Sequence, residues 1–106
     1  MNSVNAHISH TLSALNAAKI MTEERLAQFP KYPPYIHAIE QVGFIARILD
    51  VKRGPTPHEN QHIDIGLMAV KEFDALDPEY AVALSELSFR FKKPWWLHQV
   101  LFRRAR

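Results

Sequence analysis

The segment Gly66–Leu84, GLMAVKEFDALDPEYAVAL, constrains this chain most, because it holds two amphipathic pieces separated by a helix-restart signal. The first piece has one mostly apolar face at helical spacing, which runs through Ile63, Leu67, Val70 and Asp74 with Phe73 beside them. At the restart, Asp77 can cap the free amides, Pro78 suits the first helical position, and Glu79 faces the positive end of the dipole. The second piece then places apolar residues at spacings of four, three and four: Tyr80, Leu84, Leu87 and Phe91. The segment therefore predicts two helices that meet at a corner.

Further helices are expected on both sides of this corner. The pattern predicts helical segments at about residues 4–27, 34–52, 56–76 and 78–92, and a last one after Lys93-Pro94. Prolines at 30, 33 and 34 end the first segment, and Gly54-Pro55 ends the second. No segment alternates with a period of two, and no hairpin turn occurs. Because the connections are short, we expect an all-α fold, a small antiparallel bundle of roughly four to five helices.

The composition is typical of a globular protein with one core. The chain has 106 residues, of which 47% are hydrophobic and 23% charged, and we expect residues 1–106 to form a single domain. It contains no cysteine, so disulfides, thiolate metal sites and a cysteine nucleophile are excluded. No signal peptide is evident at the start, and no apolar run approaches the roughly 20 residues of a membrane-spanning helix. A cytoplasmic protein is the expectation.

The positive charge is concentrated at the C-terminal end. Residues 1–89 contain 7 basic and 11 acidic side chains, whereas residues 90–106 contain 6 basic and no acidic ones. In the segment 94–106, basic residues accompany Trp95 and Trp96, so an adaptor that binds membranes or nucleic acid through this segment is an alternative. The favoured interpretation is a last helix that lays a tryptophan on the bundle and leaves its arginines in water, with neither nucleic acid nor a membrane as partner.

One short motif suggests metal chemistry. His58-Glu59-Asn60-Gln61-His62 spells H-E-x-x-H, which on a helix places two imidazoles on one face for zinc, and Glu86 follows 24 residues later as a conceivable third ligand. A small zinc hydrolase is therefore the enzymatic alternative. However, Thr56 and Glu59 also form a capping-box pattern, in which Glu59 serves helix initiation. We favour the capping box and expect no metal, no cofactor and no catalytic residue.

The glycines argue against nucleotide binding. The chain has only Gly43, Gly54 and Gly66, and none belongs to a loop that could cradle phosphates. Gly43 and Gly66 are expected to allow close approach between helices. No serine or threonine lies in a nucleophile elbow. With no enzymatic signature favoured, an interaction module remains as the functional class.

The corner itself resembles a known family. The run Ala69–Asp74, AVKEFD, with Asp77-Pro78-Glu79 and Ala83-Leu84 behind it, is similar to the core of a small family of type VI secretion immunity proteins. The best-known member neutralises a toxin that hydrolyses NAD(P)+. A second similar stretch covers Phe29-Pro30, Tyr32, Gln41, Ile45 and Leu49. Together the stretches Phe29–Leu49 and Gly66–Leu84 cover 40 of the 106 residues.

The resemblance implies an immunity protein that inhibits a secreted antibacterial toxin domain stoichiometrically by covering its active site. An NAD(P)+ glycohydrolase is the first expected partner, and an ADP-ribosyltransferase is the second. The acidic side chains of the corner would attract a basic toxin surface. The residues expected to bind the toxin are Glu72, Asp74, Asp77, Glu79 and Tyr80, followed by Tyr32 and Tyr35.

Overall fold

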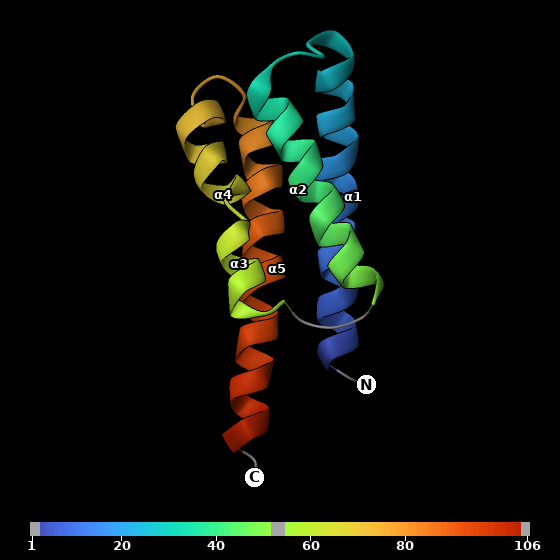
Figure 1. Ribbon diagram of the computed structural model, residues 1–106, viewed down its shortest axis with the longest axis vertical. Coiled ribbons are helices and arrows are strands. Elements are labelled where there is room, and N and C mark those ends of the chain that lie inside the picture. Colours follow the sequence, from blue (N-terminus) through green and yellow to red (C-terminus); the bar gives the residue numbers. More distant parts are fainter. Residues whose placement is uncertain (1–2, 52–54, 105–106) are drawn as a thin grey trace.

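The computed structural model describes the backbone of residues 3–51 and 55–104, and the side chains of residues 6, 8–51 and 55–92. The helices are α1 (Ser3–Gln28), α2 (Pro33–Asp50), α3 (Pro57–His62), α4 (Ile65–Met68), a π-helical turn η1 (Ala69–Phe73), and α5 (Pro78–Arg104). The chain runs up α1, down α2, up through α3 to η1, and down α5 (Figure 1). Over the described residues the fold is all-α and antiparallel, which confirms the predicted class.

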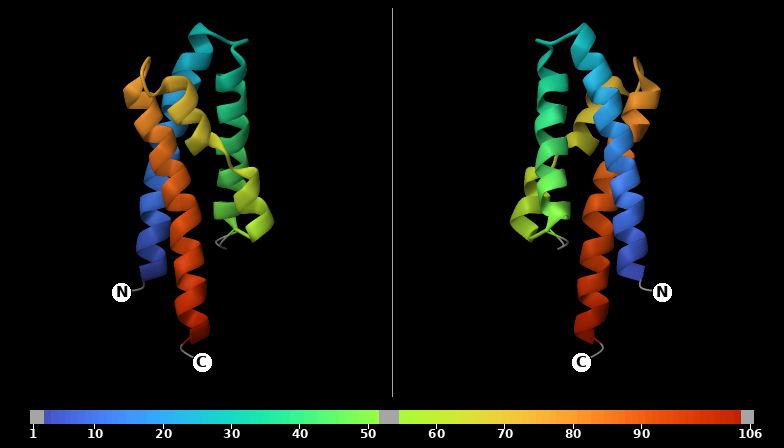
Figure 2. Two further views of the ribbon diagram at one scale, coloured as in Figure 1. Left: turned by 90° about the vertical axis from the view of Figure 1, so that its left-hand side faces the viewer. Right: turned by 90° about the vertical axis from the view of Figure 1, so that its right-hand side faces the viewer.

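Three long helices form the frame, and the short elements complete it. α1 packs against both α2 and α5, while α4 and η1 pack against α5. Seen from either side, α4 and η1 lie between α5 and α2 (Figure 2). This places the corner that the sequence singled out beside the first turns of α2. The most deeply buried large apolar side chains are Ile45, Ile63, Ile65, Leu84, Leu87 and Phe91.

The single helix predicted over residues 56–76 is broken in the structure. After α3 ends at His62, the chain is extended at Ile63, and α4 begins at Ile65. Gln41, a buried side chain of α2, satisfies the polar groups of this break: its amide nitrogen donates to the His62 carbonyl (2.6 Å). Its amide oxygen accepts from the backbone N–H groups of Asp64 (2.9 Å) and Ile65 (3.1 Å). A side chain from another helix therefore replaces the hydrogen bonds that a continuous helix would have made.

The break also changes which face of this segment is buried. The predicted apolar face is wrong at Leu67 and Val70, each of which is 60% exposed. Ile65, Ala69 and Phe73 are buried instead, at successive spacings of four. The interruption at residues 63–64 resets the helical phase, so the periodicity counted from Ile63 no longer applies beyond it. The face at Leu67 and Val70 thus points outward.

The second predicted face is confirmed. Tyr80, Leu84, Leu87 and Phe91 are all 0% exposed along α5. The expected helix end at Lys93-Pro94 is wrong, because α5 continues to Arg104, although proline normally disfavours a helix interior. The proposed packing of Trp95 or Trp96 on the bundle concerns side chains outside the described residues.

Gly66 permits the close packing of α4 on α5. A Cβ atom added at Gly66 would lie 2.9 Å from the Ser88 Oγ and 3.1 Å from the Ser88 Cβ. At Gly43, by contrast, the nearest atom would be an Arg47 nitrogen of the same helix at 3.6 Å, an ordinary contact. The expectation of close helix approach is therefore confirmed at Gly66 and wrong at Gly43.

These two glycines form a matched test of that contact. We expect Gly66→Ala to lower the free energy of unfolding by about 1–2 kcal/mol, because α4 and α5 must separate or repack. Gly43→Ala should instead be neutral or raise it by up to about 1 kcal/mol, since alanine is the better helix former. Urea denaturation of both variants measures the two values. Adding Ser88→Gly to Gly66→Ala should recover part of the loss, and equal stabilities of the two alanine variants would contradict the contact.

Candidate functional site

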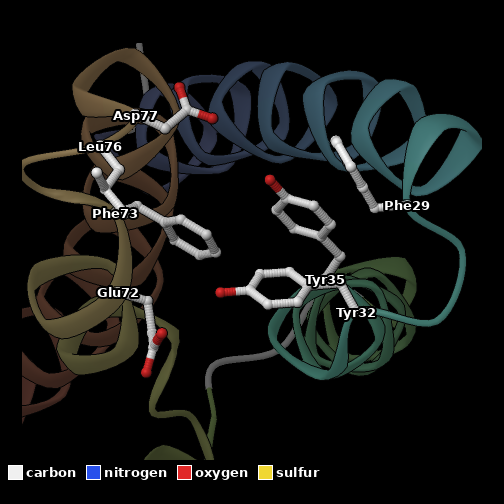
Figure 3. A pocket seen from close by; sticks show the side chains of 7 residues that line it. All are labelled: Phe29, Tyr32, Tyr35, Glu72, Phe73, Leu76 and Asp77. Atoms are coloured by element: carbon white, nitrogen blue, oxygen red, sulfur yellow. The ribbon is translucent and has the colours of Figure 1, made fainter.

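An aromatic groove opens where the first turn of α2 faces η1 and the start of α5. Its volume is about 410 Å³, and its lining residues are Phe29, Tyr32, Tyr35, Glu72, Phe73, Leu76 and Asp77. Figure 3 shows Tyr35 of α2 and Tyr32, the residue just before that helix, reaching toward the opposite wall, which Phe73 and Glu72 form. We call this site the aromatic groove. It brings together residues from both stretches of the sequence that resemble the immunity family.

The walls of the aromatic groove are held by ring contacts. The rings of Tyr35 and Phe73 stack at 5.5 Å between centroids with an interplanar angle of 8°. Tyr32 meets Tyr35 edge to face at 4.9 Å, and Phe29 lies 6.4 Å from Tyr35. Offset and edge-to-face geometries of this kind are the favourable arrangements for aromatic pairs. Tyr32 remains 40% exposed, so it presents aromatic surface to solvent at the groove.

Tyr80 forms the base beneath these walls. It is 0% exposed, and its ring lies 4.9 Å from that of Phe73 and 5.8 Å from that of Tyr35. Its hydroxyl lies 2.7 Å from the Thr22 hydroxyl, which itself donates to the Ala18 carbonyl, so the Tyr80 hydroxyl is the donor. Burial raises the pKa of Tyr80. A direct contact between Tyr80 and a partner is not available in this conformation.

An ion pair closes one end of the groove. The Arg25 guanidinium of α1 donates to both carboxylate oxygens of Asp77, at 2.7 and 3.2 Å, and lies 4.6 Å from the centroid of the Tyr80 ring. The hydrogen bond from Arg25 lowers the pKa of the Asp77 carboxyl, and the backbone N–H of Tyr80 lowers it further, against the effect of burial. Asp77 therefore caps α5, as expected, and is also neutralised by Arg25. A second hollow shares Phe29, Tyr35 and Asp77 with the aromatic groove and is also lined by Glu24, Arg25, Ala27 and Gln28.

The ion pair predicts a pH dependence of stability. Because the folded-state pKa of Asp77 is lowered, its contribution is complete above the unfolded value, about 3.9, and is lost as the pH falls through the folded value. We expect Asp77→Asn to lower the free energy of unfolding by about 1 kcal/mol at pH 7, and this difference from wild type should persist to about pH 4 and shrink as the pH falls further through the lowered folded-state pKa. Denaturation curves between pH 2 and pH 7 measure it. Asp74→Asn, an exposed control in the same corner, should change little at neutral pH, and a difference for Asp77→Asn that grows with acidity would contradict the pairing.

The other acidic candidates lie on the outside of the corner. Glu72, Asp74 and Glu79 are exposed, and Glu72 lines the aromatic groove. The predicted acidic patch is therefore present, but Asp77 is half-buried and paired with Arg25, so its charge is largely compensated. The uncompensated negative charge of the corner comes from the three exposed carboxylates. Of these, Glu72 stands at the groove itself.

The H-E-x-x-H segment lies in α3, and its Glu59 belongs to the capping box that begins this helix. The Thr56 hydroxyl accepts from the Glu59 backbone N–H (3.1 Å), and the Glu59 carboxylate accepts from the Thr56 N–H (2.9 Å), so the predicted capping box is confirmed. His58 and His62 are exposed on α3, and the His62 ring packs against Phe44 at 4.8 Å. Among the described residues, no group of three ligating side chains is placed to hold a metal ion. Within the same part of the chain, no helix is both long and apolar enough to cross a membrane.

Several residues in and beside the aromatic groove are not indicated by the sequence. Arg25 carried no signal, because it lies 52 positions from its partner Asp77 and belongs to a different helix. Leu76, which is 88% exposed at the rim, resembles an ordinary residue of a connecting turn. The sequence pattern places Phe73 only beside an apolar face. The interruption at residues 63–64, which turns Phe73 inward, depends on Gln41 and is not visible in the local pattern.

Comparison with known proteins points to one family. The model of the Tsi6 family matches residues 10–93, a range that includes the aromatic groove and ends before the basic segment 94–106. The protein named Immune protein Tsi6 from Pseudomonas aeruginosa (strain PAO1) is 32% identical over 72 residues, which are 68% of this chain and 76% of that protein. The solved structure of Tsi6 from Pseudomonas aeruginosa superposes with a TM-score of 0.67 at 27% identity, and the match covers 76% of this chain and 83% of that one.

Proposed function

Because this chain belongs to the Tsi6 family of type VI secretion immunity proteins, we propose that it binds and stoichiometrically inhibits a cognate antibacterial toxin domain that consumes NAD(P)+. Inhibition is by occlusion: the folded chain covers the toxin's active-site cleft and excludes its substrate. The toxin is an NAD(P)+ glycohydrolase in the first instance and an ADP-ribosyltransferase in the second. The encounter takes place in the cytoplasm, and the immunity protein itself catalyses no reaction.

The aromatic groove is the observation that carries this proposal. Interface anchors in tight complexes are enriched in aromatic residues that sit in or beside well-packed pockets. Here Tyr32 and Leu76 are exposed at the rim of a groove whose base is fixed by the buried Tyr80. The exposed acids Glu72, Asp74 and Glu79 surround this corner. A basic toxin surface, of the kind that attracts a nucleotide phosphate, is the complementary partner.

The seven candidate residues take two roles in this proposal. Five contact the toxin from the surface of the corner: Tyr32, Tyr35, Glu72, Asp74 and Glu79. The other two, Asp77 and Tyr80, support that surface, since Asp77 is paired with Arg25 and Tyr80 is 0% exposed. A complex of this kind buries roughly 1,600 Å² in total, so the contact extends beyond the aromatic groove itself.

Co-expression tests the proposal directly. The C-terminal domain of the protein encoded by the neighbouring upstream gene is expressed in bacteria with and without this chain, and growth, cellular NAD+ and co-purification are measured. We expect the toxin alone to arrest growth and deplete NAD+, and the pair to grow and to co-purify at a fixed stoichiometry. A toxin that remains lethal, and that forms no complex with the folded chain, would overturn the proposal. Rescue without a change in NAD+ in the toxin-only culture would retain the immunity function and reject the toxin class.

Reversing the charge of two exposed acids tests whether the corner contacts the toxin. We expect Glu72→Lys with Asp74→Lys to weaken toxin binding about 30-fold, mostly through slower association, because two attractive charges become repulsive. Both residues are exposed, so circular dichroism should show unchanged helicity. The matched control is Glu40→Lys with Asp50→Lys, which makes the same change in net charge at exposed positions of α2 that do not line the groove. Equal affinities of the two double variants would place the interface elsewhere.

A further inference from the structure

We propose that the aromatic groove receives a single arginine side chain of the toxin, whose guanidinium stacks on the tyrosine rings and pairs with Glu72. This inference rests on the proposed function and names the chemistry of its central contact. It follows from three properties of the groove: the aromatic walls, the distribution of charge, and a contact of the same kind already present inside this protein.

The walls suit a flat cation. Tyr35 and Phe73 are stacked nearly parallel, and the more exposed Tyr32 presents its ring at the mouth (Figure 3). The faces of aromatic rings carry partial negative charge, so they attract a guanidinium or an ammonium group. A guanidinium adds planar stacking to this attraction, whereas an ammonium does not. The volume of about 410 Å³ accommodates one long side chain together with part of its backbone.

The charge at the groove selects a cation over an anion. Two carboxylates, Glu72 and Asp77, line it. Asp77 is already bound by Arg25 through both of its oxygens, so Glu72 supplies the available negative charge. Glu72 has no ion-pair partner among the side chains that the structure describes. A phosphate or a carboxylate would be repelled here, whereas a guanidinium gains a charge-assisted hydrogen bond.

A contact of the proposed kind, an arginine bound by a tyrosine ring and a carboxylate, already exists inside this protein. Arg25 places its guanidinium 4.6 Å from the centroid of the Tyr80 ring while it donates two hydrogen bonds to Asp77. This is an arginine held by a tyrosine face and a carboxylate at once. Tyr32 or Tyr35 with Glu72 offers the same pair of chemical groups on the open side of the groove. The toxin arginine would therefore make the same two contacts, with a tyrosine ring and a carboxylate, that Arg25 makes inside the protein.

Double-mutant cycles with the purified toxin domain test this inference. We expect Glu72→Gln to weaken binding about 10-fold in calorimetry, as for the loss of a hydrogen bond to a charged group. One surface arginine of the toxin, replaced by methionine, should weaken binding similarly and should make the Glu72→Gln change nearly silent. The control Glu79→Gln, at an exposed acid outside the groove, should show no such coupling to that arginine.

The failures of the two proposals are distinguishable. If the wild-type complex forms but Glu72→Gln is additive with every toxin arginine, the arginine contact is overturned and the immunity function stands. If no complex forms with wild type, the proposed function falls, and the chemistry of the groove is decided on the isolated chain. There, N-acetyl-arginine amide should shift the NMR signals of the Tyr32 and Tyr35 rings, whereas its neutral isostere N-acetyl-citrulline amide should not. Equal or absent shifts for the two probes would overturn the inference.

Discussion

Tyr80→Ala should lower the free energy of unfolding by about 4 kcal/mol, the largest change expected for a single substitution in the site. The residue is 0% exposed, and its ring contacts Phe73, Tyr35 and the Arg25 guanidinium at once. Truncation leaves a cavity under the aromatic groove and removes the surface on which Arg25 rests. Since domains of this size are stable by roughly 5–15 kcal/mol, a large part of the stability would be lost. Urea denaturation followed by circular dichroism measures the change.

Tyr80→Phe is the matched control for this prediction. It keeps the ring and removes only the hydroxyl that donates to Thr22, so a loss of about 1 kcal/mol is expected. Thr22 still donates to the Ala18 carbonyl, and no buried hydroxyl hydrogen is left without an acceptor. If the phenylalanine and alanine variants were equally destabilised, the hydroxyl and not the ring would hold the groove together.

Gln41→Leu should lower the free energy of unfolding by about 3 kcal/mol, although leucine is the more apolar residue at this buried position. The amide of Gln41 makes three hydrogen bonds to the backbone at the break between α3 and α4, and the N–H of Ile65 is buried there. The substitution leaves these groups unpaired, and a buried unpaired group carries its full desolvation penalty. Denaturation measures the total effect. Hydrogen exchange at the Ile65 amide should also accelerate more than exchange in α1.

His37→Ala provides the contrast on the same helix. The His37 side chain contacts the Asp64 carboxylate at the same break, but both groups are largely exposed. We therefore expect a loss of less than about 1 kcal/mol. A result in which His37→Ala destabilises as strongly as Gln41→Leu would mean that the ion pair, and not the buried amide, fixes the break.

The features that were predictable from the sequence are those that local signals determine. The end of α1 and the start of α2 follow from the prolines around residue 30, and the capping box follows from Thr56 and Glu59 within one turn. The buried face of α5 is continuous from Tyr80 to Phe91, so its periodicity identifies the core correctly. Pro94 shows the limit of a local signal, because α5 continues through it.

The features that were not predictable depend on groups distant in sequence. The break at residues 63–64 is satisfied by Gln41, more than 20 positions earlier. Without that side chain, the pattern of residues 56–76 is consistent with one continuous helix, and Leu67 and Val70 would then face inward. In the same way, Asp77 carries a local capping signal, but nothing near it indicates that Arg25 binds its carboxylate. The aromatic residues of the site were identifiable, whereas their assembly into a groove was not.

Contacts at the base of the aromatic groove join the last turns of α1 to the start of α5. The Thr22–Tyr80 and Arg25–Asp77 contacts join residues separated by 58 and 52 positions, so both close long loops. Such contacts form only after α1 and α5 have docked, and neither half of the chain can make the groove alone. A molecule that occupies it therefore binds the folded state and not the unfolded one. By mass action, a ligand at 100 times its dissociation constant would add about 2.7 kcal/mol to the free energy of unfolding.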